Sequence, residues 1–218
     1  MGVRENPEDQ RVAKNKTKKT NSMKKGWIIF LIIVGTIVLI GVFVSGINNS
    51  MVTKQEGVNT AWSNVENVYQ RRLDLIPNLV NIVKGVANFE QSTLTAVIEA
   101  RAKATSITID PSKATPQQLQ QFTEAQNGVK SSLSRLMVVV EKYPELKATQ
   151  NFSELQAQLE GTENRIAVER RKFNEAAQTY NTYIRRFPNS LFAGMFNFQP
   201  RAYFEADKGA EKAPEVKF

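Results

Sequence analysis

The chain of 218 residues contains no cysteine and no histidine. Without cysteine there are no disulfides and no thiolate chemistry, and without histidine there is neither an imidazole base nor the commonest metal ligand. The residues that remain for catalysis, such as a Ser/Lys dyad or a carboxylate pair, show no nucleophile elbow, SxxK motif or phosphate loop. These absences predict a protein that is not an enzyme and that has no cofactor and no metal site.

Charge is also absent from one long stretch, WIIFLIIVGTIVLIGVFVSGI, which covers the 21 residues from Trp27 to Ile47. A helix rises about 1.5 Å per residue, so this length crosses a hydrocarbon core of about 30 Å. We therefore predict a transmembrane helix over residues 27–47. A cleaved signal peptide is the alternative, because small residues near the end resemble a cleavage site, but its apolar region is usually only ~7 to 15 residues long.

Charges on the two sides of this stretch are unequal. Residues 1–26 carry eight basic and three acidic side chains, whereas the twenty residues that follow the stretch contain Lys54 as their only basic residue. The positive-inside rule then predicts a single pass through the (inner) membrane, with a cytoplasmic N-terminus and an extracytoplasmic or periplasmic C-terminal domain. The basic tail, residues 1–26, is predicted to be disordered and to lie against anionic lipid of the bilayer.

The basic tail accounts for most of the net charge of +8, leaving only +3 for residues 48–218. A nucleic-acid-binding domain needs a basic face with interleaved aromatic residues. The nearly balanced charge and the predicted orientation therefore indicate no nucleic-acid partner. No motif indicates a small-molecule substrate.

Beyond the membrane the apolar residues recur at spacings of three and four, and no alternating strand pattern interrupts them. Helices are predicted at about 58–87, 88–106, 115–143 and 151–187, with Pro77 kinking the first helix and Thr115 capping the third. The predicted fold class is all-α. One N-terminal transmembrane helix is followed, over residues 48–187, by a long antiparallel up-down bundle of about four helices with coiled-coil-like seams.

Three charged residues interrupt the apolar seams of these helices, namely Arg72, Arg101 and Glu169. A buried carboxylate without a cation costs about 3 to 5 kcal/mol, and Arg72 and Glu169 fall at similar heights in an up-down bundle. We hypothesise a cluster of Glu169 with Arg72 or Arg101 that sets the helix register. The alternative is that Glu169 reaches solvent at the margin of the seam.

Residues 188–218 form an aromatic tail that begins with prolines and glycine among large side chains and ends in a charged stretch predicted to be disordered. The tail is too apolar to be solvated along its whole length. It could pack under the bundle, touch the bilayer interface or cover a neighbouring subunit. The possible interaction surface comprises Phe192, Phe196, Phe198, Tyr203 and Phe204.

Four stretches of sequence carry a family resemblance: WSNVENVYQRRLDLIPNLVNIVKGVA, YPELKA, LEGTENRIAVERRKFNEAAQTYNTYIRRFPN and FNFQPRAYFEA. Their order and content resemble the bacterial LemA family over roughly residues 58–206. The resemblance implies a membrane helix carrying a long helical bundle without assigned catalytic residues, and it favours organisation of membranes or of neighbouring membrane proteins. Five residues match the most recognisable stretch, and we expect them to have a structural use: Asn164, Arg165, Asn174, Tyr180 and Asn181.

Two functional classes follow. The first is a membrane-anchored scaffold or adaptor that recruits other membrane proteins, organises membrane or self-associates. The second is a sensor or regulatory subunit whose bundle responds to a ligand or partner. The sensor is the weaker hypothesis, because 26 residues before the span are too few for an output domain.

Overall fold

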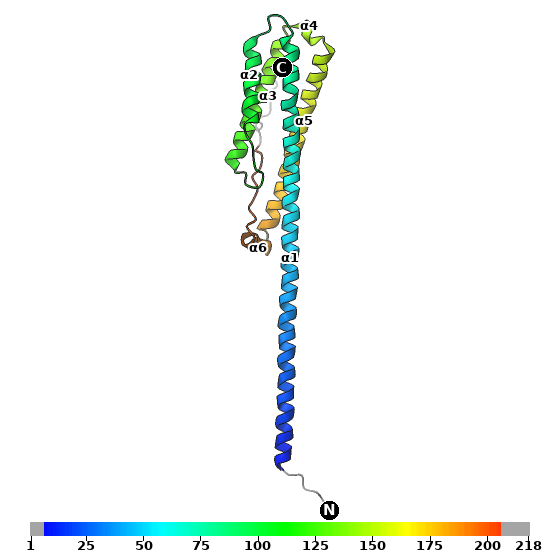
Figure 1. The fold of residues 1–218 in the computed structure, drawn as a ribbon, viewed down its shortest axis with the longest axis vertical. Helices are drawn as coiled ribbons and strands as arrows, with labels where there is room; N and C mark the ends of the chain where they lie inside the picture. The colour runs from blue at the N-terminus through cyan, green and yellow to red at the C-terminus, as the bar shows by residue number, and fades with distance from the viewer. Residues whose placement is uncertain (1–6, 206–218) are drawn as a thin grey trace, which may run out of the picture. The chain divides into compact units, whose positions relative to one another are not determined.

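A computed structural model describes the backbone of residues 7–205 and the side chains of residues 26–205. Every regular element in this described part is a helix (Figure 1). The elements are α1 (Pro7–Lys84), α2 (Gln91–Thr105), α3 (Pro116–Val140), α4 (Pro144–Lys147), α5 (Gln150–Arg185) and α6 (Asn189–Met195). The all-α prediction is confirmed, and the expected four helices become six within residues 7–205 through the two short helices α4 and α6.

The chain divides into two units, Met1–Ser50 and Met51–Phe218. Residues 1–26 were predicted to be disordered, but the backbone of residues 7–26 is helical and belongs to α1. Disorder of residues 1–6 and of the chain end stays a prediction, because residues 1–6 and 206–218 lie outside the described part. Residues 189–195, which the sequence analysis assigned to an irregular tail, form α6.

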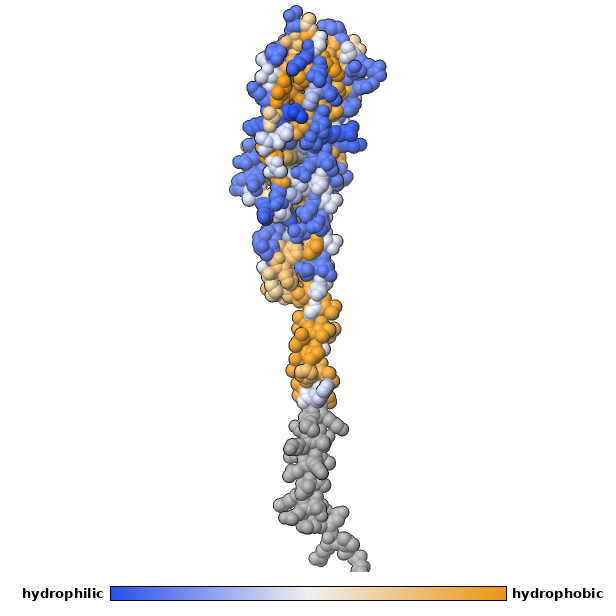
Figure 2. Space-filling view, in the orientation of Figure 1, coloured by the Kyte–Doolittle hydropathy of each residue, from blue (hydrophilic) through white to orange (hydrophobic). Residues whose placement is uncertain are grey.

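The first unit contains one helical stretch long and apolar enough to cross a membrane, with a mean hydropathy of 3.0 over 18 residues and no buried share. Apolar side chains cover this stretch (Figure 2). Its hydroxyl groups bond within the helix, since Thr36 Oγ1 donates to Ile32 O and Ser45 Oγ to Gly41 O, each over 2.8 Å. Such internal bonding is what a hydrocarbon environment demands of polar groups.

In the second unit, α2, α3 and α5 pack with the α1 residues from Met51 onward around one apolar core. The core side chains are mostly aliphatic and come from α1, α2, α3, α4 and α5. Fully buried examples are Leu79, Val83, Leu94, Val97, Val129, Leu136 and Phe152. The three-four spacing of apolar residues in the sequence therefore marks the faces that pack.

An aromatic cluster extends this core around Trp62, which is 1% exposed. Its ring centroid lies 5.6 Å from Phe122 on α3 and 5.6 Å from Phe173 on α5. Trp62 also stacks on Phe204, with centroids 5.9 Å apart and planes 11° from parallel. A residue far along the chain thus completes packing that begins on α1.

Side-chain caps account for the starts of α3 and α5. Thr115 and Gln118 form the predicted capping box at the start of α3. The start of α2 differs from expectation, because Asn88 has a φ of 59° and belongs to the preceding turn, so Glu90 is the residue before the helix. At α5, Thr149 Oγ1 accepts from Phe152 N, which places the start at Gln150, one residue before the predicted position.

Candidate functional site

Arg72 on α1 is buried, with 2% of its surface exposed, and its guanidinium forms hydrogen bonds to both α3 and α5. Nη1 donates to Glu163 Oε1 on α5 over 2.5 Å, and Nη2 donates to Gln126 on α3, reaching Oε1 over 2.5 Å and the backbone O over 3.0 Å. The guanidinium carbon also lies 5.2 Å from the centre of the Tyr69 ring. A buried cation with several acceptors joins α1, α3 and α5 at one level.

Glu169 is not the partner of Arg72, which corrects the predicted cluster. Its Oε1 accepts from Lys172 Nζ, one turn further along α5, over 2.8 Å. Glu163 and Glu169 are six residues apart, so they point about 120° apart around the helix, at heights that differ by about 9 Å. The spacing of apolar residues placed Glu169 on the packed face of the helix. The carboxylate that binds Arg72 is instead that of Glu163, which lies at the edge of that face.

Arg101 also stays apart from the cluster, and it bonds to backbone instead. Its Nε donates to Leu73 O on α1 over 3.0 Å. Leu73 lies four residues before Pro77, and proline has no N–H to donate to that carbonyl. Arg101 therefore supplies the hydrogen bond that Pro77 cannot, and α1 continues through Pro77 to Lys84.

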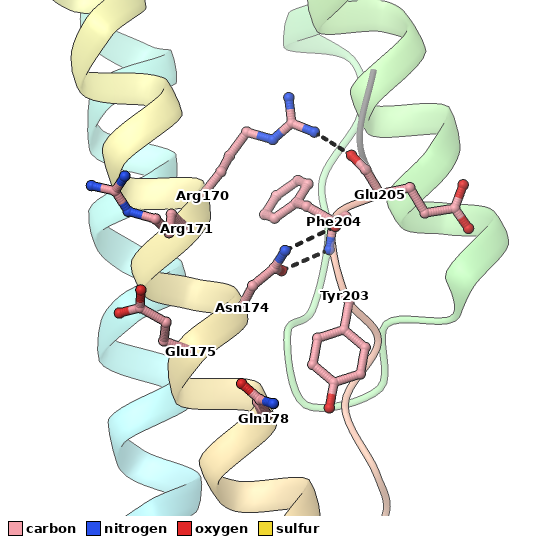
Figure 3. Close-up of a pocket in the computed structure, with 8 residues that line it drawn as sticks. All are labelled: Arg170, Arg171, Asn174, Glu175, Gln178, Tyr203, Phe204 and Glu205. Carbon is pink, nitrogen blue, oxygen red and sulfur yellow. Dashed lines mark hydrogen bonds between the residues drawn. The ribbon is translucent and has the colours of Figure 1, made fainter. Parts of the chain in front are cut away.

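The extended segment, residues 198–205, runs beside α5 and is bound there through its backbone (Figure 3). Asn174 Nδ2 donates to Phe204 O, and Asn174 Oδ1 accepts from Phe204 N, both over 2.9 Å. Asn181 makes the same pair of bonds to Arg201 O and Arg201 N, both over 2.8 Å. Two side-chain amides therefore bind the segment as a neighbouring strand would.

The spacing of the two asparagines matches the spacing of the residues they bind. Seven residues of helix separate Asn174 from Asn181 by about 10 Å on one face. Three residues of extended chain separate Arg201 from Phe204 by about 10 Å as well. Tyr180 on α5 binds the start of the segment as well, because its hydroxyl donates to Gln199 O over 3.0 Å.

Arg201 connects the extended segment to the loop between α2 and α3. Its Nη1 donates to Pro111 O over 3.0 Å and to Ser112 O, and its guanidinium lies 5.7 Å from the Tyr180 ring centre. The loop is itself ordered by Asp110, whose Oδ1 accepts from Ser112 N over 2.8 Å. The Ser112 hydroxyl and N–H lower the pKa of Asp110, because both hydrogen bonds favour the carboxylate.

The predicted aromatic interaction surface does not form one surface. Phe204 is 5% exposed and belongs to the Trp62 cluster, where the Arg170 guanidinium lies 4.9 Å from its ring centre. Phe192 and Phe198 are half-buried. Phe196 and Tyr203, at 41% and 43% exposure, are the members that face solvent.

A hollow of about 510 Å³ lies between α5 and the extended segment, lined by both charged and amide side chains (Figure 3). Arg170 Nη2 donates across it to Glu205 O over 2.9 Å. Arg170 and Asn174, two of the polar lining residues, thus already bind the chain itself. Within residues 26–205 no three carboxylates gather closely enough to hold a metal ion.

Comparison with known proteins places these features in a family. Residues 61–218 match the LemA family. The chain belongs to the LemA family. It is 29% identical over 189 residues to magnetosome protein MamQ 1 of Paramagnetospirillum magneticum, covering 77% of this chain and 68% of the relative. A protein LemA of Metamycoplasma hominis is 26% identical over 195 residues, covering 86% of this chain and 85% of the relative.

Membership of the LemA family confirms the resemblance, and three of the residues that carried it have structural roles, whereas Asn164 and Arg165 are exposed. Asn174, Tyr180 and Asn181 bind the extended segment rather than another helix. The sequence signal for this arrangement was the pair of asparagines seven residues apart on the packed face of a helix. Their partner could not be identified from that signal, because the backbone N–H and C=O groups of almost any residue can form such a pair of bonds.

Proposed function

We propose that this LemA-family chain is a membrane-anchored scaffold or adaptor without enzymatic activity, which presents its helical bundle to partner proteins or to other copies of itself. Its anchor is the apolar stretch over residues 27–47. Its N-terminus is cytoplasmic, and the bundle is extracytoplasmic, as the basic residues before the apolar stretch favour.

One observation carries this proposal: the polar side chains that interrupt the helix seams bind to the chain's own groups. Arg72 binds Glu163 and Gln126, and Asn174 and Asn181 bind the backbone of the extended segment. A site for chemistry keeps reactive groups available to a substrate. Here the groups hold separate parts of one domain together, which leaves the outer faces of the bundle for function.

The family relatives support an organising role. Several are named magnetosome proteins, including MamQ of Magnetospirillum gryphiswaldense, which is 28% identical over 189 residues. That name assigns those relatives to a cellular structure and not to a reaction. For this chain we propose the same type of role, at the membrane that holds its anchor.

Crosslinking of the full chain in native membranes, followed by mass spectrometry of the crosslinked species, tests this role. A membrane protein recovered in constant ratio supports an adaptor, and large species of this chain alone support a scaffold. A chain recovered only as an uncrosslinked monomer, under conditions that trap a known membrane complex, contradicts both.

The orientation can be tested separately, because the chain has no cysteine of its own. A single cysteine at the exposed residue Ser134 should react with an impermeant maleimide added outside intact cells or spheroplasts. A cysteine placed at Ser22 should react only after lysis. The reverse pattern would reject the proposed orientation while leaving the scaffold role open.

A further inference from the structure

The end of α5 and the helix that follows it leave large apolar side chains in solvent. Phe187 is 82% exposed, Leu191 63%, Met195 74% and Phe196 41%. Leu191 and Met195 share one face of α6, while Ala193 on the other face is buried at 5% exposure. We call these four exposed residues the apolar foot. Figure 2 shows apolar side chains gathered at the end of the second unit that carries α6.

The chain around the apolar foot is free of acidic residues. No aspartate or glutamate occurs between Glu175 and Glu205, although glutamate is frequent in the rest of the bundle. Arg185 and Arg186 lie immediately before Phe187, and both are exposed. Exposed arginine beside exposed aromatic and aliphatic side chains is the combination that binds the headgroup region of an anionic bilayer.

The connection to the apolar stretch keeps this end of the bundle near the membrane. Lys54 Nζ lies 5.2 Å from the centre of the Tyr183 ring, so α1 at Lys54 and the last turns of α5 are neighbours within the second unit. Lys54 follows Ile47 by seven residues. Seven residues reach about 10 Å as helix and at most about 25 Å when fully extended, whatever the angle between the units.

We propose that the apolar foot inserts into the headgroup and upper acyl region of an anionic bilayer, with Arg185 and Arg186 bound to lipid phosphates. This inference rests on the proposed membrane anchor. The foot gives the domain a second attachment to the membrane crossed by residues 27–47, and it restricts how far the bundle can tilt from the surface. A bundle held at two points presents its outer faces to partners in a limited range of directions.

Depth measurements on the full chain in liposomes test the proposal. The variants Met195→Cys and Val138→Cys each carry one environment-sensitive NBD label, and the liposomes contain doxyl-labelled lipids as quenchers. Val138 is the matched control, because it is also exposed, at 69%. It lies near the C-terminal end of α3, which is close to the C-terminal end of α1 and so distant from the apolar foot. Between Met51 and Lys84, α1 is about 50 Å long.

In liposomes containing phosphatidylglycerol, we expect the label at residue 195 to shift its emission to the blue and to be quenched by shallow doxyl groups. The label at residue 138 should show neither effect. Equal quenching at both positions, or none at residue 195, overturns the proposal. A blue shift at residue 195 without lipid quenching also overturns it, because a second copy or another protein would then cover the foot.

Carbonate extraction of the same liposomes separates this inference from the proposed function. A chain that carbonate releases has no transmembrane anchor, which would reject the proposed function. A chain that stays in the membrane but shows no quenching at residue 195 rejects only the foot.

The role of charge is tested by Arg185→Gln with Arg186→Gln in the labelled Met195→Cys chain. We expect loss of the extra quenching that phosphatidylglycerol produces over phosphatidylcholine alone. Arg135→Gln with Arg171→Gln removes the same charge from exposed positions elsewhere in the bundle and should retain that extra quenching. An equal loss in both pairs, or no loss in either, overturns the binding of lipid phosphates by Arg185 and Arg186.

Discussion

Arg101 Nε donates to Leu73 O over 3.0 Å, and Leu73 O is the carbonyl that Pro77 leaves without its helical partner. The donor comes from α2 and lies 28 residues further along the chain. A buried carbonyl without a partner costs about 1 to 3 kcal/mol. The arginine therefore compensates for the proline, and the bond also fastens α2 to the C-terminal part of α1.

This relationship predicts that the cost of losing Arg101 depends on Pro77. We expect Arg101→Met to lower the free energy of unfolding by about 1 to 3 kcal/mol in the natural chain. In a Pro77→Ala background the cost should fall by about 1 kcal/mol, because the backbone N–H of the introduced alanine can donate to Leu73 O. Urea unfolding of the detergent-solubilised chain, followed by circular dichroism, measures both values.

Arg135→Met is the matched control, since Arg135 is exposed on α3 and the same atoms are removed there. Its cost should be small and the same in both backgrounds. If Arg101→Met costs the same with and without Pro77, the compensation does not exist.

The pairing of Arg72 makes a second prediction. Arg72→Met should destabilise the bundle by about 3 kcal/mol, because it strands Gln126 and Glu163 without their donor. A double-mutant cycle of Arg72→Met with Glu163→Gln should show coupling of about 1 kcal/mol or more in urea unfolding. The cycle of Arg72→Met with Glu169→Gln is the control, and coupling as large in that cycle would contradict the observed pairing.

A third prediction concerns the attachment of the extended segment to α5. Asn181→Asp replaces the Nδ2 donor with an oxygen that faces Arg201 O, so the segment should detach while the helices remain. Trypsin should then cleave after Arg201 much faster than in the natural chain, where that residue is 7% exposed. Gln178→Glu makes the same chemical change at an exposed position on α5, and cleavage after Arg201 in that variant should stay slow.

The fourth prediction is a loss of stability in alkali that depends on Tyr180. Burial raises the pKa of Tyr180, and the nearby Arg201 guanidinium offsets part of that rise. A raised pKa means that the fold favours the neutral phenol, so the stabilisation is complete below the unfolded pKa of about 10 and is lost as the pH rises above it.

Urea unfolding at about pH 8 and pH 11 measures this effect. Tyr180→Phe should be less stable than the natural chain at the lower pH by about 1 kcal/mol, the value of its bond to Gln199 O. The difference should shrink or reverse at the higher pH. Tyr143→Phe, which removes a hydroxyl that donates to Asn88 O over 3.0 Å, controls for the lost hydrogen bond at the lower pH. A constant difference for Tyr180→Phe would refute the prediction.

Local patterns in the sequence were enough to predict the class of fold. The spacing of apolar residues identified the helices and their packed faces, and Thr115 with Gln118 marked the start of α3 correctly. Two short helices were missed, because α4 and α6 have only 4 and 7 residues, and so few residues show no period. The Asn88 turn was mistaken for a cap, since asparagine suits both conformations.

The polar contacts required information that one helix does not carry. Pro77 shows from sequence alone that Leu73 O lacks a partner, but not that Arg101 supplies one. Arg72 pairs with Glu163 and not with Glu169 because the Glu163 side chain reaches it from the edge of the packed face, and this reach cannot be read from the spacing of residues. Asn174 and Asn181 bind backbone groups 30 and 20 residues further along the chain, and backbone groups do not depend on which side chain the residue carries.

Phe204 stacks on Trp62 and so links the timing of folding to the length of chain that has been made. In the proposed orientation, the aromatic cluster cannot close until residue 204 has left the ribosome and crossed the bilayer. Until then Trp62 lacks the Phe204 ring that stacks on it, and Asn174 and Asn181 lack the backbone groups that they bind. The extended segment is therefore the last part of the described fold to be completed during synthesis.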